Sequence, residues 1–381
     1  MKKIEKEIEQ FIQENGEDMI NTVCRLVRIP SVACEDDSGY PYGRACAEAL
    51  DYLDVLAKQY GLETEMYDYQ GLEIRFPQKS PGKRVLFAAH TDVVPPSEGG
   101  FYPAFGETVD RNYIIGRGAV DDKTPLLAVL FAMVYLQKKH VPLWIDVRLF
   151  CGSHEETDMK DILYYLERAG QPDLGLAVDD DFPVTNGEKG VLKFVLRMAE
   201  KDGACGNDVV EKLLTDEKGE LTGIHVVSET MGETVCCVKQ TGAGECRIDA
   251  RIPVELPVAE ARERVGDFAK KSGMEFEVLK EEDGYYIAGD RVAPKLLTDL
   301  YNEVTGADEV PYVMKGCTYA RHFRCGCGFG AGDPHEKKPF QEGHGGAHQP
   351  DEAHNIDVFF NAVKMYVLGI LRLNAYYTEG Q

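Results

Sequence analysis

The sequence is poor in basic side chains, with 42 lysines and arginines against 65 aspartates and glutamates among its 381 residues. The formal net charge is −23 at pH 7, and the isoelectric point lies near 4.8. Nucleic acids and anionic membranes attract proteins through basic surfaces, because cationic side chains displace the counterions of the phosphates. The shortage of positive charge therefore argues against a nucleic-acid-binding or membrane-binding protein.

Long hydrophobic runs are also lacking. Every apolar stretch falls well short of the ~18 residues that a membrane-spanning helix requires. The N-terminus, from Met1 to Lys6, enters an amphipathic pattern directly and lacks the apolar core of a signal peptide. These features predict a cytoplasmic protein.

The cysteines show no regular framework. They number eleven, an odd count, and are scattered along the chain, which indicates reduced thiols rather than disulfide bonds. Cys317 and the Cys325-Gly326-Cys327 segment lack the two-residue spacer of a tetrahedral zinc knuckle. The cysteines therefore do not predict a structural zinc site.

The segments that remain carry clear helical and strand periodicity, in a chain long enough for two domains of roughly 150 residues each. A helical pattern runs from Ile4 to Leu26 and is expected to break at Asn15-Gly16, and a second helix from Arg44 to Tyr60 ends at Gly61. Next come two strands, an apolar helix and another strand, at residues 73–76, 85–89, 126–136 and 144–150. This alternation predicts an α/β layer with buried parallel strands.

The middle of the chain has a different pattern. Between Val191 and Tyr286, short alternating runs surround two charged helices, at 208–214 and 258–272, which predicts a smaller α+β domain inserted into the first. Helical periodicity returns after Ala293, and the chain closes with an apolar helix at 356–373. The predicted division is 1–188, an inserted domain at 189–287, and 288–381.

Polar groups end two of the predicted strands. His90 and Asp92 follow the strand at 85–89 and, by period-two alternation, lie on one face at its carboxyl end. Open α/β sheets place their sites at such ends. A carboxylate near a metal-bound imidazole fixes its tautomer, and Asp92 is placed to do so for His90. Glu155 and Glu156 end the strand at 144–150, and since neighbours point apart, one can bind a metal while the other reaches its water.

Three further segments add carboxylates and a histidine. Asp121 and Asp122 follow the glycine-rich turn Gly116-Arg117-Gly118, where the alternative interpretation is a pair of helix caps. Asp179 is the first of three aspartates after a short strand, and His348 precedes the last helix. Imidazole and carboxylate ligands without thiolates point to a hydrolytic zinc, manganese or cobalt centre, and the number of carboxylates suits two metals.

Read together and in order, these motifs resemble the co-catalytic dinuclear zinc family of aminoacylases, carboxypeptidase G-type enzymes, desuccinylases and bacterial Xaa-His dipeptidases. The dipeptidase branch is the most similar, through Asp181-Phe182-Pro183-Val184, Asn186-Gly187-Glu188-Lys189-Gly190, Gly316-Cys317-Thr318-Tyr319-Ala320-Arg321 and His348-Gln349 with Glu352. The resemblance implies a zinc-peptidase-like catalytic domain with a mixed, mostly parallel sheet between helices, and a small inserted α+β lid.

The resemblance also assigns roles to the motif residues. It implies that His90, Asp121 and Asp179 hold one divalent ion and that Asp121, Glu156 and His348 hold a second one, most simply zinc, with manganese or cobalt as alternatives. Asp92 would orient His90, and Glu155 would be the general base.

The substrate implied is a dipeptide or N-acyl amino acid with a free carboxylate, which arginine forks bind well. Arg251, Arg321 and Thr318 match family positions that contact substrate. The alternative for each arginine is an ordinary surface side chain.

The lid departs from the family pattern. The family carries an oxyanion-stabilising histidine in a Gly-x-x-x-His-Ala-Ser type segment, and neither that segment nor the Asn-x-Val-Pro turn occurs here. The histidine between Val191 and Tyr286 is His225, which we interpret as an ordinary strand residue. We therefore expect a reduced lid and, since small lids in this family often pair, a homodimer. The leading hypothesis is a two-metal amide hydrolase; the rival is a non-catalytic descendant that binds metals or peptides.

Overall fold

The computed structural model describes residues 2–78, 80–198 and 206–379, which form two compact units. The larger unit contains residues 1–185, 289–311 and 318–381, and the smaller one contains residues 186–288 and 312–317. The segment Tyr312–Cys317, which the sequence analysis assigned to the last part of the chain, thus packs with the smaller unit. It does so because its strand pairs with residues of that unit.

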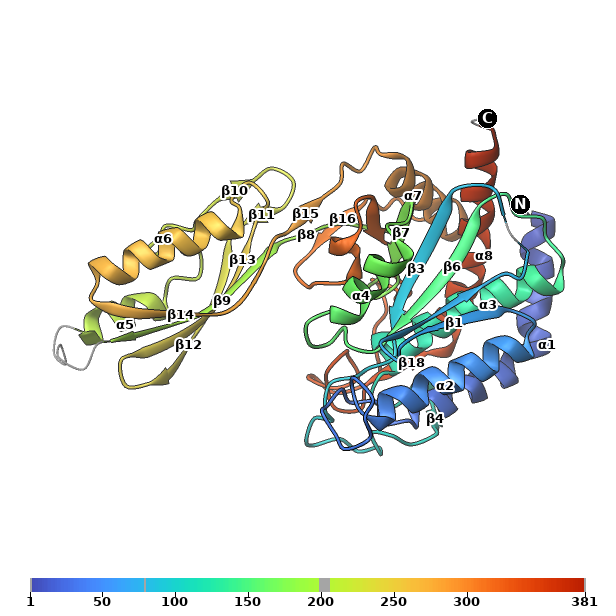
Figure 1. Cartoon of the computed structure of the whole chain (residues 1–381), viewed down its shortest axis with the longest axis horizontal. Coiled ribbons are helices and arrows are strands. Elements are labelled where there is room, and N and C mark those ends of the chain that lie inside the picture. The colour runs from blue at the N-terminus through green and yellow to red at the C-terminus, as the bar shows by residue number, and fades with distance from the viewer. Residues whose placement is uncertain (1, 79, 199–205, 380–381) are drawn as a thin grey trace. The chain divides into compact units, whose positions relative to one another are not determined.

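A six-stranded sheet forms the centre of the larger unit (Figure 1). In spatial order its strands are β1 (Glu63–Tyr67), β2 (Gly71–Arg75), β6 (Asp146–Gly152), β3 (Arg84–His90), β7 (Leu174–Ala177) and β17 (Gly326–Gly328). The last four run parallel, while β1 and β2 pair antiparallel. The predicted mixed, mostly parallel α/β sheet is confirmed.

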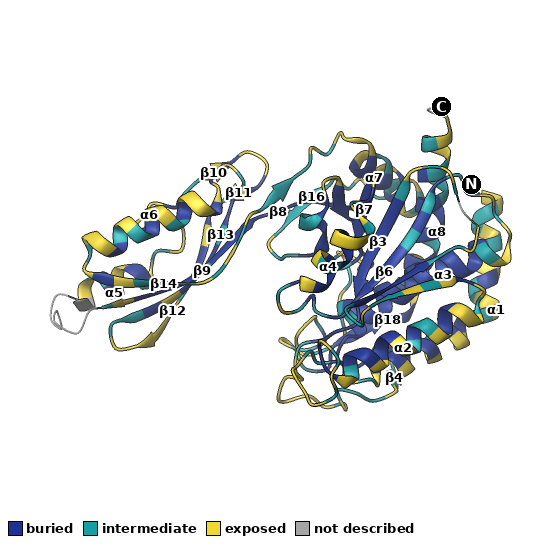
Figure 2. Ribbon diagram, in the orientation of Figure 1, coloured by how far each residue is buried: buried dark blue, intermediate teal, exposed yellow. Residues whose placement is uncertain are grey.

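Six helices accompany this sheet: α1 (Lys2–Val27), α2 (Arg44–Gln59), α3 (Thr124–Lys138), α4 (Lys160–Ala169), α7 (Val292–Thr305) and α8 (Ile356–Glu379). Helix α3 packs against strands β3 and β6 and against α8. It is apolar around its whole circumference, and Figure 2 shows it buried along its length. An all-round hydrophobic helix of this kind belongs in the interior of a layered fold.

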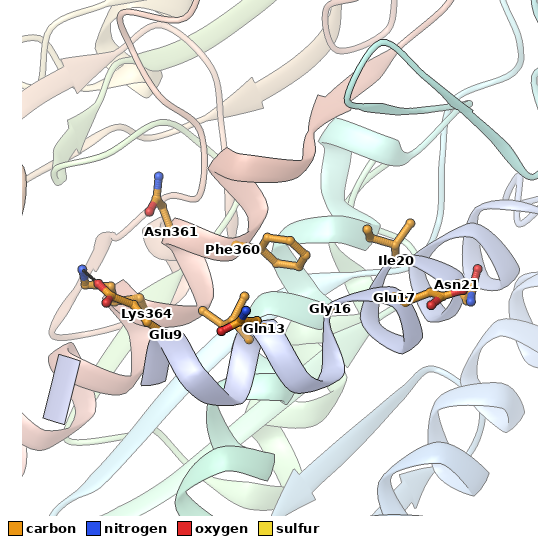
Figure 3. A pocket seen from close by; sticks show the side chains of 10 residues that line it. Glu9, Gln13, Gly16, Glu17, Ile20, Asn21, Phe360, Asn361 and Lys364 are labelled. Atoms are coloured by element: carbon orange, nitrogen blue, oxygen red, sulfur yellow. Dashed lines mark hydrogen bonds and ion pairs between the residues drawn. The ribbon is translucent and has the colours of Figure 1, made fainter. Parts of the chain in front are cut away.

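Helix α1 corrects one expectation, because it runs without a break through Asn15 and Gly16. Figure 3 shows Gly16 facing the ring of Phe360 on α8. A Cβ atom at position 16 would lie 3.0 Å from that ring, so the glycine makes room for the packing of the two helices. Asn15 stays helical because its amide donates a 2.7 Å hydrogen bond to the carbonyl of Phe11. A glycine that permits close packing therefore replaces the expected helix stop.

The larger unit also contains a small antiparallel sheet of β4 (Thr108–Asp110), β5 (Tyr113–Ile115) and β18 (Ala353–Asn355), in the order β18-β5-β4. Ala353 pairs with Ile115, so the chain just after β5 lies next to the chain just before β18. The two segments are more than 200 positions apart in the sequence. This pairing brings the turn that carries Asp121 close to the segment that carries His348.

The smaller unit is built on a four-stranded antiparallel sheet with the order β12-β13-β9-β14. Its elements are β9 (Gly190–Met198), α5 (Gly206–Leu214), β12 (Val235–Gly242), β13 (Glu245–Ile252), α6 (Val258–Lys271) and β14 (Met274–Glu282). Short strands complete it: β8 (Thr185–Glu188), β10 (Val227–Ser228), β11 (Gly232–Glu233), β15 (Tyr285–Tyr286) and β16 (Tyr312–Met314). Alternate residues of β9 pack with the apolar face of α6 in a core of their own. The predicted α+β character of this region is confirmed.

Two observations complete the description. None of the helices that the structure describes is long and apolar enough to cross a membrane. The described cysteines are free thiols, and Cys327 and Cys151 are among those that lie in the protein interior.

Candidate metal centre and active site

The first candidate metal cluster lies at the carboxyl ends of two neighbouring parallel strands. His90 ends β3, and Asp179 follows β7, whose Ala177 pairs with Ala88. The Nε2 atom of His90 lies 3.7 Å from an Asp179 oxygen and 3.0 Å from Oδ1 of Asp121, which comes from the turn Ala119–Lys123. Strand register and one loop thus bring together three residues that are far apart in the sequence.

The second cluster shares Asp121 with the first. Its other carboxylate oxygen, Oδ2, lies 3.0 Å from Nε2 of His348, and the same nitrogen lies 3.0 Å from a Glu156 oxygen. Within each cluster the candidate ligand atoms all lie within 4.8 Å of one another. Asp121 therefore presents one oxygen to each group, as a bridging ligand would.

The chemistry of these groups fits divalent cations. Nε2 of His90, Oδ1 of Asp121 and Oε1 of Glu155 are buried and make no hydrogen bond of acceptable geometry among the residues that the structure describes, although the first two atoms lie 3.0 Å apart. Such atoms are costly unless something compensates them. Imidazole nitrogens and carboxylate oxygens are the ligands that zinc, manganese and cobalt accept in hydrolases. A pair of cations would satisfy both the unpaired atoms and the concentrated negative charge.

The pKa values follow from burial and from this crowding. Burial and the nearby charge of Asp121 raise the pKa of Asp179 to about 8. Burial lowers the pKa of His90, but the carboxylates of Asp121, Asp179 and Asp92 outweigh it and raise that pKa well above its usual value. The carboxylates of Asp121 and Glu156 raise the pKa of His348 to about 10. Since bound metal requires deprotonated ligands, ion binding would release protons here.

Asp92 holds two parts of the site together. Nδ1 of His90 lies 3.0 Å from the backbone carbonyl of Asp92 and 3.4 Å from its carboxylate. The carboxylate oxygens accept hydrogen bonds from the backbone amides of Glu155 and Glu156, each at 3.1 Å. Asp92 thus contacts the imidazole and also fixes the loop that carries both glutamates.

Glu155 and Glu156 point in different directions, as their adjacency in the chain suggests. Glu156 contacts His348, whereas Glu155 is buried and makes no contact with that histidine in the bonds described. Burial raises the pKa of Glu155 well above the usual value of a glutamate. A buried carboxyl group with a perturbed pKa beside a cluster of candidate ligands is a candidate for a proton-transfer role.

The alternative interpretation of Asp121 and Asp122 as helix caps does not hold. Lys123 stands at the N-cap of α3, and no side-chain hydrogen bond caps that helix end. Asp122 is fully buried and accepts a 3.2 Å hydrogen bond from the amide of His90. Both aspartates therefore contact candidate ligands rather than the helix terminus.

The sequence analysis assigned no role to two buried carboxylates, Asp161 and Glu352, that contribute to this geometry. Asp161 accepts hydrogen bonds from the amides of Ser153 and His154, at 2.7 and 2.8 Å, and also contacts the hydroxyl of Tyr319. Glu352 accepts hydrogen bonds from the amides of the Asp121 turn. A carboxylate that binds distant backbone amides leaves no periodic signal in a sequence, so only the motif that contains Glu352 pointed to its neighbourhood.

The candidate substrate residues divide between the two units. Thr318 precedes the short helical turn Tyr319–His322 of the larger unit, and Arg321 lies within it. The Thr318 hydroxyl accepts a hydrogen bond from the amide of Ala320 at 3.2 Å. Arg251 lies on β13 of the smaller unit and contacts Asp249 at 3.1 Å and the sulfur of Cys317 at 3.6 Å. Both arginines are partly buried.

His225 also belongs to the smaller unit, and it corrects a second expectation. It lies in the loop before β10 rather than in a strand, and its Nε2 atom lies 3.4 Å from a Glu233 oxygen. The short strand begins two residues later because the preceding segment, Leu221 to Gly223, forms a turn.

The sequence matches the model of peptidase family M20/M25/M40 over residues 86–372. The chain belongs to this family. "Putative dipeptidase YtjP" of Bacillus subtilis (strain 168) is 23% identical over 462 aligned positions, which cover 94% of this chain and 97% of the relative. The alignment has more positions than this chain has residues, so the relative contains stretches without a counterpart here.

Solved structures share the fold. Human carnosine dipeptidase 1 has a TM-score of 0.78 at 14% identity, covering 98% of this chain and 99% of that one. Bacillus subtilis YXEP, described as a dinuclear metal binding peptidase, has a TM-score of 0.63 at 11% identity, covering 95% and 99%. The resemblance to the dipeptidase branch is confirmed, and the protein is a metal-dependent peptidase. The rival hypothesis of a non-catalytic descendant is not favoured.

Proposed function

We propose that this peptidase hydrolyses the amide bond of a dipeptide or an N-acyl amino acid with the help of two divalent cations. The observation that carries the proposal is the position of Asp121, whose two oxygens face two separate clusters of ligands. The names of the relatives, dipeptidases and a dinuclear metal binding peptidase, support it.

In this proposal His90, Asp121 and Asp179 hold one cation, and Asp121, Glu156 and His348 hold the other. When bound, the two cations would lower the pKa of a water molecule and polarise the amide carbonyl. Glu155 then takes a proton from the attacking water at a carboxylate oxygen and passes it to the nitrogen of the leaving amine. Its burial beside the two clusters of candidate ligands supports this role.

The remaining residues orient these groups and the substrate. Asp92 keeps His90 and the glutamate loop in place through the contacts described above. We propose that Arg321, Arg251 and Thr318 are substrate-binding residues, since a guanidinium offers two parallel donors to a substrate carboxylate. A comparison of free dipeptides with the same dipeptides amidated at the C-terminus tests this: carboxylate recognition requires a large loss of kcat/KM for the amides.

The central experiment combines metal counting with turnover. The protein is stripped with a chelator, reconstituted with zinc, manganese or cobalt, and analysed for metal per chain and for hydrolysis of a panel of dipeptides and N-acetyl amino acids. We expect two ions per chain and hydrolysis that disappears with the metal. A single ion per chain, or no turnover with any of the three metals, would overturn the proposal. The identity of the native metal, a homodimer, the cytoplasmic location and the absence of nucleic-acid or membrane partners stay predictions.

A further inference from the structure

A buried ion pair lies next to both segments that supply the second metal cluster. Arg117 and Glu352 are 3% and 1% exposed, and a guanidinium nitrogen of Arg117 contacts a carboxylate oxygen of Glu352. Removing two charges from water costs free energy, and a well-packed apolar pair is often at least as stable. Stability alone therefore does not explain why this ion pair is buried. The other hydrogen bonds of the two residues show which backbone segments the pair fixes.

Glu352 fixes the backbone of the bridging ligand. Its Oε1 atom accepts hydrogen bonds from the amides of Val120 and Asp121, at 2.9 and 3.1 Å. Its backbone carbonyl accepts a third bond, from the amide of Gly116, at 2.8 Å. The segment from Gly116 to Asp121 is thus attached at both ends to one residue just before β18.

Arg117 fixes the backbone of the other ligand. Its second terminal nitrogen, Nη2, donates to the carbonyl of His348 at 3.2 Å and to the hydroxyl of Ser97 at 3.1 Å. Ser97 in turn donates to the same carbonyl at 2.8 Å. His348 lies in an exposed turn with a φ of +63°, a backbone conformation that costs a non-glycine residue roughly 1–2 kcal/mol. Arg117 and Ser97 hold the residue in that conformation.

We propose that Arg117 and Glu352 form a positioning pair that sets the separation of Asp121 and His348, and thereby the affinity of the second metal site. The inference rests on the proposed two-metal function. Arg117 contacts the backbone of His348, a candidate ligand of the second cation only, and does not contact His90 or Asp179 in the bonds described. Loss of its forked geometry should therefore weaken the second site selectively.

The test is a calorimetric titration of the metal-free enzyme with Co²⁺, followed also by the visible absorption of the bound ion. For the wild type we expect two binding events. Arg117→Lys keeps the positive charge but loses the two-pronged guanidinium. The Co²⁺ affinity of the second event should then fall roughly 10- to 100-fold, the range typical of residues that orient metal ligands. The affinity of the first event should change less than about threefold. Glu352→Gln provides a second variant if the lysine variant folds poorly. Its second event should weaken by a similar factor, and its first event should weaken less, because Glu352 holds the backbone of Asp121, which serves both sites.

The matched control is Arg148→Lys. Arg148 pairs with the buried Glu73 at 3.0 Å in the same unit, but neither residue contacts a candidate ligand in the bonds described. This control should lower the melting temperature without changing either binding event. Equal weakening of both events, or no change in either, for Arg117→Lys and Glu352→Gln would overturn the positioning role. A wild type that binds fewer than two ions would instead overturn the proposed function.

Discussion

The two units of the chain differ in where they bury charged side chains, although the smaller unit also buries Glu188 and Lys189. The larger unit buries His90, Asp92 and Asp122 completely, and the pKa values of several of its acids are raised by burial. The main core of the smaller unit is apolar, and charged side chains of its helix α6, such as Arg262 and Arg264, form ion pairs at its surface. Since buried charge is costly without compensation, the buried acids of the larger unit fit the proposed cations, whereas the main core of the smaller unit is formed by apolar side chains.

The largest effect expected from this contrast is at Asp121. Asp121→Ala removes an oxygen from both clusters, so neither cation should bind tightly, and turnover should be lost. Metal content per chain, measured by elemental analysis after dialysis, checks this. Asp110→Ala is the matched control, because Asp110 is an exposed carboxylate on β4 of the same unit. Near-normal metal content in Asp121→Ala would refute the bridging role.

The next effect separates two neighbouring glutamates. Glu155→Gln should lower kcat on the order of 10³-fold and leave two ions bound, because an amide neither accepts nor returns the proton of the attacking water. Glu156→Gln should instead lose the second ion, since Glu156 contacts His348. Single-turnover rates together with metal content distinguish the two variants. An active Glu155→Gln enzyme would transfer the role of base to another carboxylate.

Features set by neighbouring residues could be predicted from the sequence, whereas features set by residues distant in the chain could not. The positions of His90 and Asp179 could be predicted because each follows a buried strand. The pattern of a strand is visible in a short stretch of sequence. The meeting of Asp121 with His348 depends on the pairing of β5 with β18, which no spacing encodes, so only the family resemblance suggested it. The break expected in α1 was wrong for the same reason. Gly16 is explained by its packing against the ring of Phe360, which is distant in the sequence.

A smaller effect concerns the stability of the larger unit and its buried histidine, His354. Burial, with the positive charge of Lys338, lowers the pKa of His354 to about 4. The unfolded chain takes up this proton near pH 6.5, while the folded protein resists it until about pH 4. The stabilising contribution of the neutral imidazole is thus present above pH 6.5 and is lost as the pH falls towards 4, by about 3 kcal/mol.

Urea unfolding of the metal-free protein between pH 7 and pH 4 measures this term. The free energy of unfolding of the wild type should fall more steeply than that of His354→Asn, whose side chain keeps a donor for the carbonyl of Asn355 but does not titrate. The difference between the two proteins removes the contribution of the metal ligands, which titrate in both. Parallel curves would show that the burial of His354 does not govern stability in this range.

The smallest effect is expected in the other unit, at His225. Its imidazole lies beside Glu233 and Glu220, at 3.4 and 4.0 Å, and its side chain is 29% exposed. We expect His225→Ala to change kcat less than about threefold, the scale of roughly 0.5 kcal/mol that is typical of surface substitutions, and to leave metal content unchanged.

The matched variant of His225→Ala is His348→Ala, which should lose the second ion because His348 is a candidate ligand and His225 is not. A loss on the order of 100-fold in kcat for His225→Ala, with KM and metal content unchanged, would make His225 the oxyanion donor that the missing lid motif fails to supply. That result would contradict the contrast between the two units, because a residue of the smaller unit would then take part in the reaction. A near-normal rate would leave the bound cations or a partner subunit to stabilise the oxyanion.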